Sequence, residues 1–123
     1  MVRQISRDEL LRMMDSKVAF KLVDVLPRES FENEHIKGAL SIPLNDIELK
    51  AAGLLKKTET IVTYCGSFDC SASTKAAEKL LLMGYQAVLD YKGGLKDYKE
   101  ANLALEGKLH EVDQDVCAEC MMC

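Results

Sequence analysis

The chain has 123 residues, of which 48% are hydrophobic and 29% are charged, so it can bury one core and is typical of a single globular domain. The formal net charge of −4, with scattered lysines and arginines and no tryptophan, argues against a nucleic-acid-binding surface. No apolar run approaches the roughly 20 residues that a membrane-spanning helix needs, and the first residues lack the apolar core of a signal peptide. We therefore expect a cytoplasmic protein that binds neither nucleic acid nor membrane, with its five cysteines as reduced thiols.

The first half of the chain alternates helical and extended patterns. Ser6 and Glu9 have the spacing of a capping box at the start of a helix. Asn45 or Asp46 is expected to cap a later helix, which Gly53 should end. In chain order, the patterns predict a helix over 6–16, a strand over 20–25, a short helix over 28–34, a short strand over 38–43 and a helix that reaches about residue 52.

The second half continues this alternation, which predicts an α/β fold with a largely parallel sheet. The elements expected there are a strand over 60–64, a helix over 71–84 that Gly84 ends, a strand over 86–90, a turn at 93–94 and a helix over 95–105. The periodicity fades from about residue 106. We therefore predict one domain over 1–106 and a cysteine-rich tail over 107–123.

Cys65 opens a six-residue loop between the strand over 60–64 and the helix that follows. A thiol at the mouth of a strand–loop–helix unit lies where backbone N–H groups converge, and these groups stabilise the thiolate. We expect the pKa of Cys65 to lie below that of a free thiol, which makes Cys65 the candidate nucleophile. The residues expected to form its substrate-binding loop are Gly66, Ser67, Phe68, Asp69 and Ser71.

Four segments, in the same order and spacing, resemble the motifs of the rhodanese family of single-domain sulfurtransferases. They are the strand over 22–25, the segment over 35–39 that is similar to the "GHIPGA" signature, Cys65 with its loop, and the glycine turn over 93–95. The resemblance covers roughly residues 5–105. It implies a rhodanese-like three-layer sandwich, in which helices flank a central, mostly parallel sheet and the active loop lies at the carboxyl ends of the strands.

The resemblance also implies a sulfurtransferase that works through a persulfide on Cys65 and needs no cofactor. A small sulfur donor or a persulfide-carrying protein leaves sulfane sulfur on Cys65, and a thiol acceptor removes it. The donor could be polysulfide, thiosulfate or a protein persulfide. Backbone N–H groups of the loop, at a helix N-terminus, can hold the persulfide anion without a general base.

This chain departs from the family pattern at positions that set the charge of the loop. Many rhodaneses carry arginine where this chain has Cys70, and many carry arginine where it has Leu26. Asp69 lowers the positive charge further, which favours polysulfide or protein persulfides over the divalent thiosulfate anion. Two interpretations of Cys70 are open: a second catalytic thiol that resolves Cys65 as a disulfide, or a small replacement for arginine.

Asp24 and His35 are expected to serve as structural residues near the site. Asp24 ends the first motif strand and should accept hydrogen bonds from backbone donors near the loop. His35 should hydrogen-bond the turn of its own motif rather than carry protons.

Cys117, Cys120 and Cys123 form two overlapping C-x-x-C units at the end of the chain. Three interpretations are open: a thiol relay that carries sulfur away from Cys65, a soft-metal site, or a tail without a partner in this chain. A zinc site usually needs four ligands in two separated pairs, so no metal is predicted. The alternative function is a non-catalytic redox- or metal-sensing module that uses Cys65, Cys70 and these tail cysteines.

Overall fold

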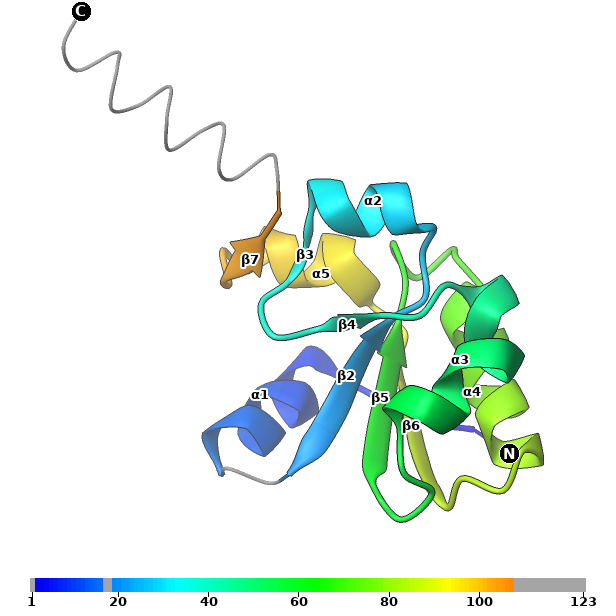
Figure 1. Ribbon diagram of the computed structural model, residues 1–123. Coiled ribbons are helices and arrows are strands. Elements are labelled where there is room, and N and C mark those ends of the chain that lie inside the picture. The colour runs from blue at the N-terminus through cyan, green and yellow to red at the C-terminus, as the bar shows by residue number, and fades with distance from the viewer. Residues whose placement is uncertain (1, 17–18, 108–123) are drawn as a thin grey trace, which may run out of the picture.

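The computed structural model describes residues 2–16 and 19–107, which form an α/β fold around a parallel sheet (Figure 1). The five strands of this sheet lie in the order β1-β6-β5-β2-β4, and all neighbouring pairs are parallel. Their bounds are Arg3–Ile5 for β1, Ala87–Tyr91 for β6, Thr60–Tyr64 for β5, Phe20–Asp24 for β2 and Leu40–Ser41 for β4. The middle strand is therefore β5, and the loop that Cys65 opens begins at its carboxyl end.

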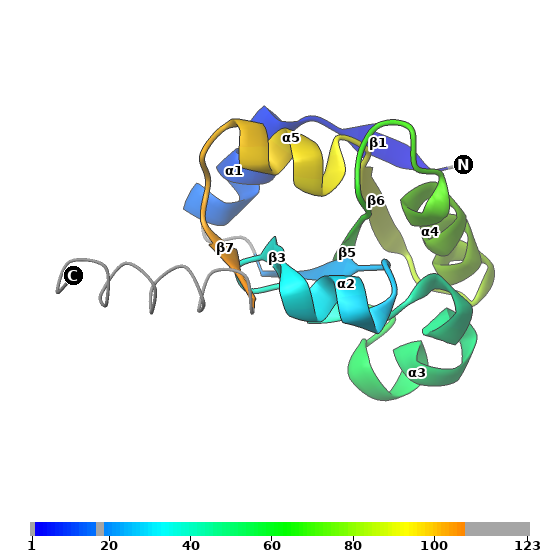
Figure 2. The ribbon, with the colours of Figure 1, turned by 90° about the horizontal axis from the view of Figure 1, so that it is seen from above.

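Helices cover both faces of the sheet, which gives the three layers expected from the sequence (Figure 2). The helices are α1 (Arg7–Asp15), α2 (Arg28–Asn33), α3 (Ile47–Leu54), α4 (Ala72–Leu82) and α5 (Gly94–Glu100), with a short 3-10 helix, η1 (Leu44–Asp46), before α3. One face packs against α3 and α4, and the other packs against α1 and α5. In the described part of the chain, no helix has both the length and the apolar character needed to cross a bilayer.

The two central strands bury side chains on both faces of the sheet. Val23 of β2 and Ile61 of β5 belong to the core under α3 and α4, whereas Leu22 and Val62 belong to the core under α1 and α5. Neighbouring residues of a strand point to opposite faces, so a strand that is covered on both sides needs a continuous apolar run. The apolar runs in the sequence therefore predicted these strands correctly.

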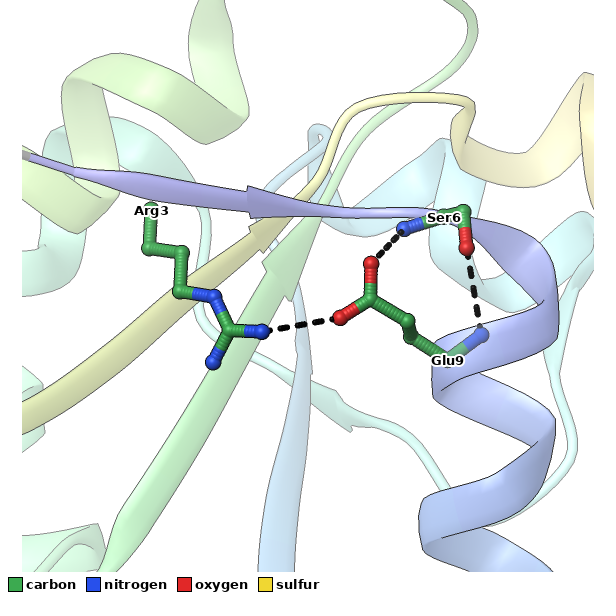
Figure 3. Close-up of polar contacts among 3 residues, drawn as sticks. All are labelled: Arg3, Ser6 and Glu9. Carbon is green, nitrogen blue, oxygen red and sulfur yellow. Dashed lines mark hydrogen bonds and ion pairs between the residues drawn. The ribbon is translucent and has the colours of Figure 1, made fainter.

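The predicted capping box is present at the corner between β1 and α1 (Figure 3). The Ser6 hydroxyl accepts from the Glu9 N–H at 3.2 Å, and the Ser6 N–H donates to Glu9 Oε1 at 3.3 Å. Arg3 of β1 donates to the other Glu9 oxygen at 3.0 Å. One carboxylate thus ties the start of the helix to the strand before it.

The prediction for Gly84 is also confirmed, whereas the prediction for Gly53 is wrong. Gly84 has φ +101°, and the N–H groups of Gly84 and Tyr85 donate to the Leu81 and Leu80 carbonyls, which is the Schellman pattern of a helix end. Gly53 lies inside α3. That helix ends one residue later because Leu55 turns into extended backbone and enters the core.

Four elements differ from the predictions, and three of them are strands that depend on long-range pairing. The sequence pattern missed β1, which is a three-residue edge strand with only Ile5 buried. It also missed the antiparallel pair of β3 (His35–Ile36) and β7 (Leu105–Glu106), two strands that lie far apart in the sequence. The last helix, α5, ends at Glu100 instead of near residue 105.

Backbone hydrogen bonds from α5 hold the start of the Cys65 loop. The N–H groups of Leu95 and Lys96 donate to the carbonyls of Cys65 and Gly66, both at 2.8 Å. Gly94 has φ +66°, and a Cβ atom at this position would lie 2.5 Å from the Cys65 carbonyl oxygen. Glycine is therefore required at residue 94 by both its backbone conformation and its close contact with the loop.

The other end of the loop is fixed where α4 begins. The Thr63 hydroxyl donates to the Ser73 carbonyl at 3.0 Å, and the Thr74 hydroxyl donates to Asp90 Oδ2 at 2.6 Å. Thr63 and Asp90 are fully buried residues of β5 and β6. The first turn of α4 is thus hydrogen-bonded to β5 and β6.

We predict that Gly94→Ala lowers the free energy of unfolding by about 2 kcal/mol or more. The added methyl group would strain the left-handed backbone at residue 94 and would overlap the Cys65 carbonyl. The matched control is Gly53→Ala, since nothing lies within 4 Å of a Cβ at residue 53. This helix substitution should raise stability by up to about 1 kcal/mol. Urea unfolding of both variants measures the difference, and equal midpoints would contradict the close contact at Gly94.

Candidate active site

Cys65 follows β5 directly and is 0% exposed. Its thiol donates to the Cys70 carbonyl at 3.4 Å, across the loop. The N–H and hydroxyl of Ser73, in the first turn of α4, also face the Cys65 sulfur. The thiol therefore lies at the base of the loop, between the end of the middle strand and the start of a helix.

Burial raises the pKa of the Cys65 thiol above its ordinary value, and the nearby Cys70 thiol raises it further. The Ser73 hydroxyl and N–H lower this pKa, but their effect is smaller than that of burial. The expectation that Cys65 has a lower pKa than a free thiol is therefore wrong. The Ser73 N–H lies beside the sulfur at the start of α4, but desolvation of the sulfur outweighs its effect.

Cys70 closes the loop and is only partly buried. Partial burial opposes the charged form of its thiol, but four neighbours together lower its pKa: the Cys65 thiol, the N–H groups of Ala72 and Gly66, and the Lys92 ammonium. Lys92 Nζ also donates to the Cys70 carbonyl at 2.6 Å. The two loop thiols thus interact with each other, and their pKa values are shifted in opposite directions.

The remaining loop residues form the rim of the site. A turn is closed by the Cys70 N–H, which donates to the Ser67 carbonyl at 3.1 Å. Phe68 is 63% exposed and lines two neighbouring hollows of about 280 and 200 Å³. Asp69 is exposed and lines the smaller hollow, and Ser71 is exposed at the N-cap position of α4.

Asp24 is fully buried at the end of β2, beside Tyr64 of the middle strand. Its Oδ1 accepts from the Leu26 N–H at 2.9 Å, which holds the turn after the strand. Burial raises the pKa of this carboxyl, and the Leu26 N–H and the Tyr64 hydroxyl offset part of the rise. Asp24 thus supports the chain that leaves β2 next to the loop.

His35 lies in β3, where its ring stacks on Phe31 with centroids 3.8 Å apart. Its Nδ1 is 2.7 Å from the Phe31 carbonyl oxygen, and its Nε2 is 3.5 Å from Glu106 Oε1. These contacts join α2, β3 and β7. The structure thus places His35 in the packing of the small antiparallel pair.

Two residues of this site were not among those predicted from the sequence: Ser73 and Lys92. Lys92 directly follows β6, which is the neighbour of β5. Because the carboxyl ends of parallel strands meet at one edge of the sheet, the position of Lys92 before the glycine turn was a usable signal. Ser73 gave no such signal, since its orientation depends on where α4 begins.

Within residues 2–16 and 19–107, no three histidine, cysteine or acidic side chains are grouped so that they could hold a metal ion. Cys117, Cys120 and Cys123 lie outside the described residues. The relay and soft-metal interpretations of these tail cysteines therefore stay predictions, as does the division of the chain near residue 106.

The chain matches a known family model and several known proteins. The model of the rhodanese-like domain matches residues 6–101. The chain is 37% identical over 76 residues to the thiosulfate sulfurtransferase PspE of Escherichia coli K12, covering 61% of this chain and 70% of PspE. It is 29% identical over 97 residues to the putative sulfur carrier protein YrkF of Bacillus subtilis 168, covering 79% of this chain but only about half, 51%, of YrkF.

A solved structure shows the same fold. The crystal structure of the BH2092 protein from Bacillus halodurans superposes with a TM-score of 0.81 at 30% identity. The alignment covers 87% of this chain and 78% of that protein.

We predict that alkylation by iodoacetamide modifies Cys70 with a midpoint pH below that of a free thiol and modifies Cys65 with a midpoint above it. The reason is that the Lys92 ammonium and backbone N–H groups favour the Cys70 thiolate, whereas burial disfavours the Cys65 thiolate. Mass spectrometry of the proteolysed chain reports each cysteine separately. A lower midpoint for Cys65 than for Cys70 would contradict this assignment.

Proposed function

This chain belongs to the rhodanese family, and we propose that it is a sulfurtransferase that moves sulfane sulfur to a thiol acceptor through a persulfide on Cys65. The similarity to PspE, named a thiosulfate sulfurtransferase, and to YrkF, named a putative sulfur carrier protein, supports sulfur transfer in general. The cytoplasmic location expected from the sequence is part of this proposal, since thiols stay reduced there.

The observation that carries the proposal is the position of Cys65, between the middle strand and the start of α4. The Ser73 N–H and hydroxyl face its sulfur and can hold the negative charge of a thiolate or a persulfide. Sulfur exchange between thiolates needs no metal or cofactor, because each step forms one sulfur–sulfur bond, breaks another and releases the donor sulfur group as an anion.

The charges that line the smaller hollow favour a protein persulfide as the donor over thiosulfate. Asp69, Asp97 and Glu100 line the smaller hollow beside Phe68, where Lys96 supplies the one positive charge among the described lining residues. A divalent anion is repelled by such a surface. The exposed Phe68 side chain suits contact with a protein donor or acceptor.

We predict that Cys65→Ser abolishes sulfur transfer to an acceptor thiol while the fold is retained. A serine hydroxyl is too weakly acidic at neutral pH to act as the nucleophile and is a poor carrier of sulfane sulfur. The assay follows transfer from polysulfide to a low-molecular-weight thiol, with circular dichroism as the folding control. Transfer at the wild-type rate by the folded variant would rule out Cys65 as the carrier. A wild-type chain that never forms a persulfide would instead support the alternative sensing function.

We predict that deletion of residues 117–123 leaves the loading of Cys65 unchanged but slows its discharge when no external thiol is present. A relay in the tail would need Cys117, Cys120 or Cys123 to attack the Cys65 persulfide, whereas loading uses only the loop. A single-turnover assay of sulfide release compares the full chain with the truncated chain. Equal discharge rates would exclude the relay, and metal analysis of both proteins would then test the soft-metal interpretation.

A further inference from the structure

The two loop thiols differ in their access to solvent. Cys65 is completely buried, whereas Cys70 is partly exposed at the other end of the same loop. A donor that arrives from solvent therefore meets Cys70 first.

Among the described residues, Lys92 has the only basic side chain for which a hydrogen bond to this loop is seen, and it bonds to Cys70. Lys92 Nζ is 2.6 Å from the Cys70 carbonyl oxygen, and its positive charge acts on the Cys70 thiol. A cation beside a sulfur stabilises the thiolate and attracts an anionic donor. The N–H groups of Gly66 and Ala72 face the same sulfur and add to this effect.

The two thiols are close enough for sulfur to pass between them. The Cys65 thiol donates to the Cys70 carbonyl at 3.4 Å, and the two thiols interact directly with each other. Both are free cysteines and do not form a disulfide. Transfer between them is therefore an intramolecular step within one short loop.

We propose that sulfane sulfur enters the protein at Cys70, whose carbonyl oxygen accepts a hydrogen bond from Lys92, and then passes to the buried Cys65. This inference rests on the proposed sulfurtransferase function and assigns the order in which the two cysteines act. It makes Cys70 the receiving nucleophile, Lys92 the positioning residue beside it, and Cys65 the protected carrier.

The chemistry balances without an added oxidant or reductant. The Cys70 thiolate attacks the terminal sulfur of a donor persulfide or polysulfide, the sulfur–sulfur bond of the donor breaks, and the donor leaves as a thiolate or a shortened polysulfide. The Cys65 S–H then gives its proton to the outer sulfur of the Cys70 persulfide. The Cys65 thiolate attacks that sulfur, the bond to Cys70 breaks, and the Cys70 thiolate is restored.

The experiment uses the full chain, with inorganic polysulfide as the donor probe. Rapid quenching with an alkylating agent and mass spectrometry of peptides then locate the added sulfur over time. In the wild-type chain, the added sulfur should appear on Cys70 before Cys65. In Cys65→Ser it should stay on Cys70, and in Cys70→Ser the loading of Cys65 should slow by about tenfold or more, because the buried thiol must act alone.

Lys92→Gln tests the positioning role without removing either thiol. This variant should slow the loading of Cys70 several-fold at neutral pH, and the deficit should shrink as the pH rises, because the Cys70 thiolate then forms without the nearby cation. Lys75→Gln, at an exposed lysine of α4, is the matched control and should load at the wild-type rate. A merely structural role of Lys92 would not give a pH-dependent deficit.

Three other outcomes show whether the order of the two cysteines or the proposed sulfurtransferase function is wrong. If a folded Cys70→Ser variant loads Cys65 at the wild-type rate, the order of the two cysteines is overturned but the sulfurtransferase function stands. If a Cys65–Cys70 disulfide and free sulfide appear before any persulfide on Cys65, Cys70 is a resolving thiol and the inference also fails. If the wild-type chain takes up no sulfur from polysulfide or from thiosulfate, the proposed function fails with it.

Discussion

Two backbone hydrogen bonds from the first turn of α5 hold the loop on which the site depends. They occupy the carbonyls of Cys65 and Gly66, and they form only because Gly94 lets the helix backbone approach the loop. With these carbonyls turned toward α5, the loop can present N–H groups to sulfur: those of Gly66 and Ala72 face Cys70, and that of Ser73 faces Cys65. The orientation of one turn thus sets the surroundings of both thiols.

The surroundings of Cys65 and Cys70 shift the pKa values of these two thiols in opposite directions. Burial holds the Cys65 thiol in its neutral form, whereas Lys92 and the N–H groups favour the thiolate at Cys70. Enzymes often separate the pKa values of two like groups in this way when the two groups have different chemical roles. In the proposed order of sulfur transfer, Cys65 would be the buried carrier and the partly exposed Cys70 the first nucleophile.

The central strands and the larger helices could be predicted from the sequence because local patterns determine them. Residues 60–64 form a mostly buried run with a high strand propensity, and the spacing of Ser6 and Glu9 is typical of a helix start. The edge strand β1 and the pair of β3 and β7 have no such pattern, since their backbone partners come from distant parts of the chain. The position of the Cys65 loop was predictable, but the sign of the Cys65 pKa shift was not, because burial of one sulfur depends on the whole fold. Lys92 was missed for a related reason: its role comes from the neighbouring strand and not from the loop itself.

The contact between Gly94 and the Cys65 carbonyl has a consequence for protein engineering. The hexapeptide from Cys65 to Cys70 is not a portable module, because two backbone hydrogen bonds that hold it come from a turn almost thirty positions away in the chain. A graft of this chemistry onto another α/β scaffold would have to carry two strand ends together: the loop with the first turn of its helix, and the adjacent lysine–glycine–glycine turn. In natural descent the same coupling would make these two segments change in concert, so that a substitution at residue 94 would persist only where the loop had been rebuilt around it.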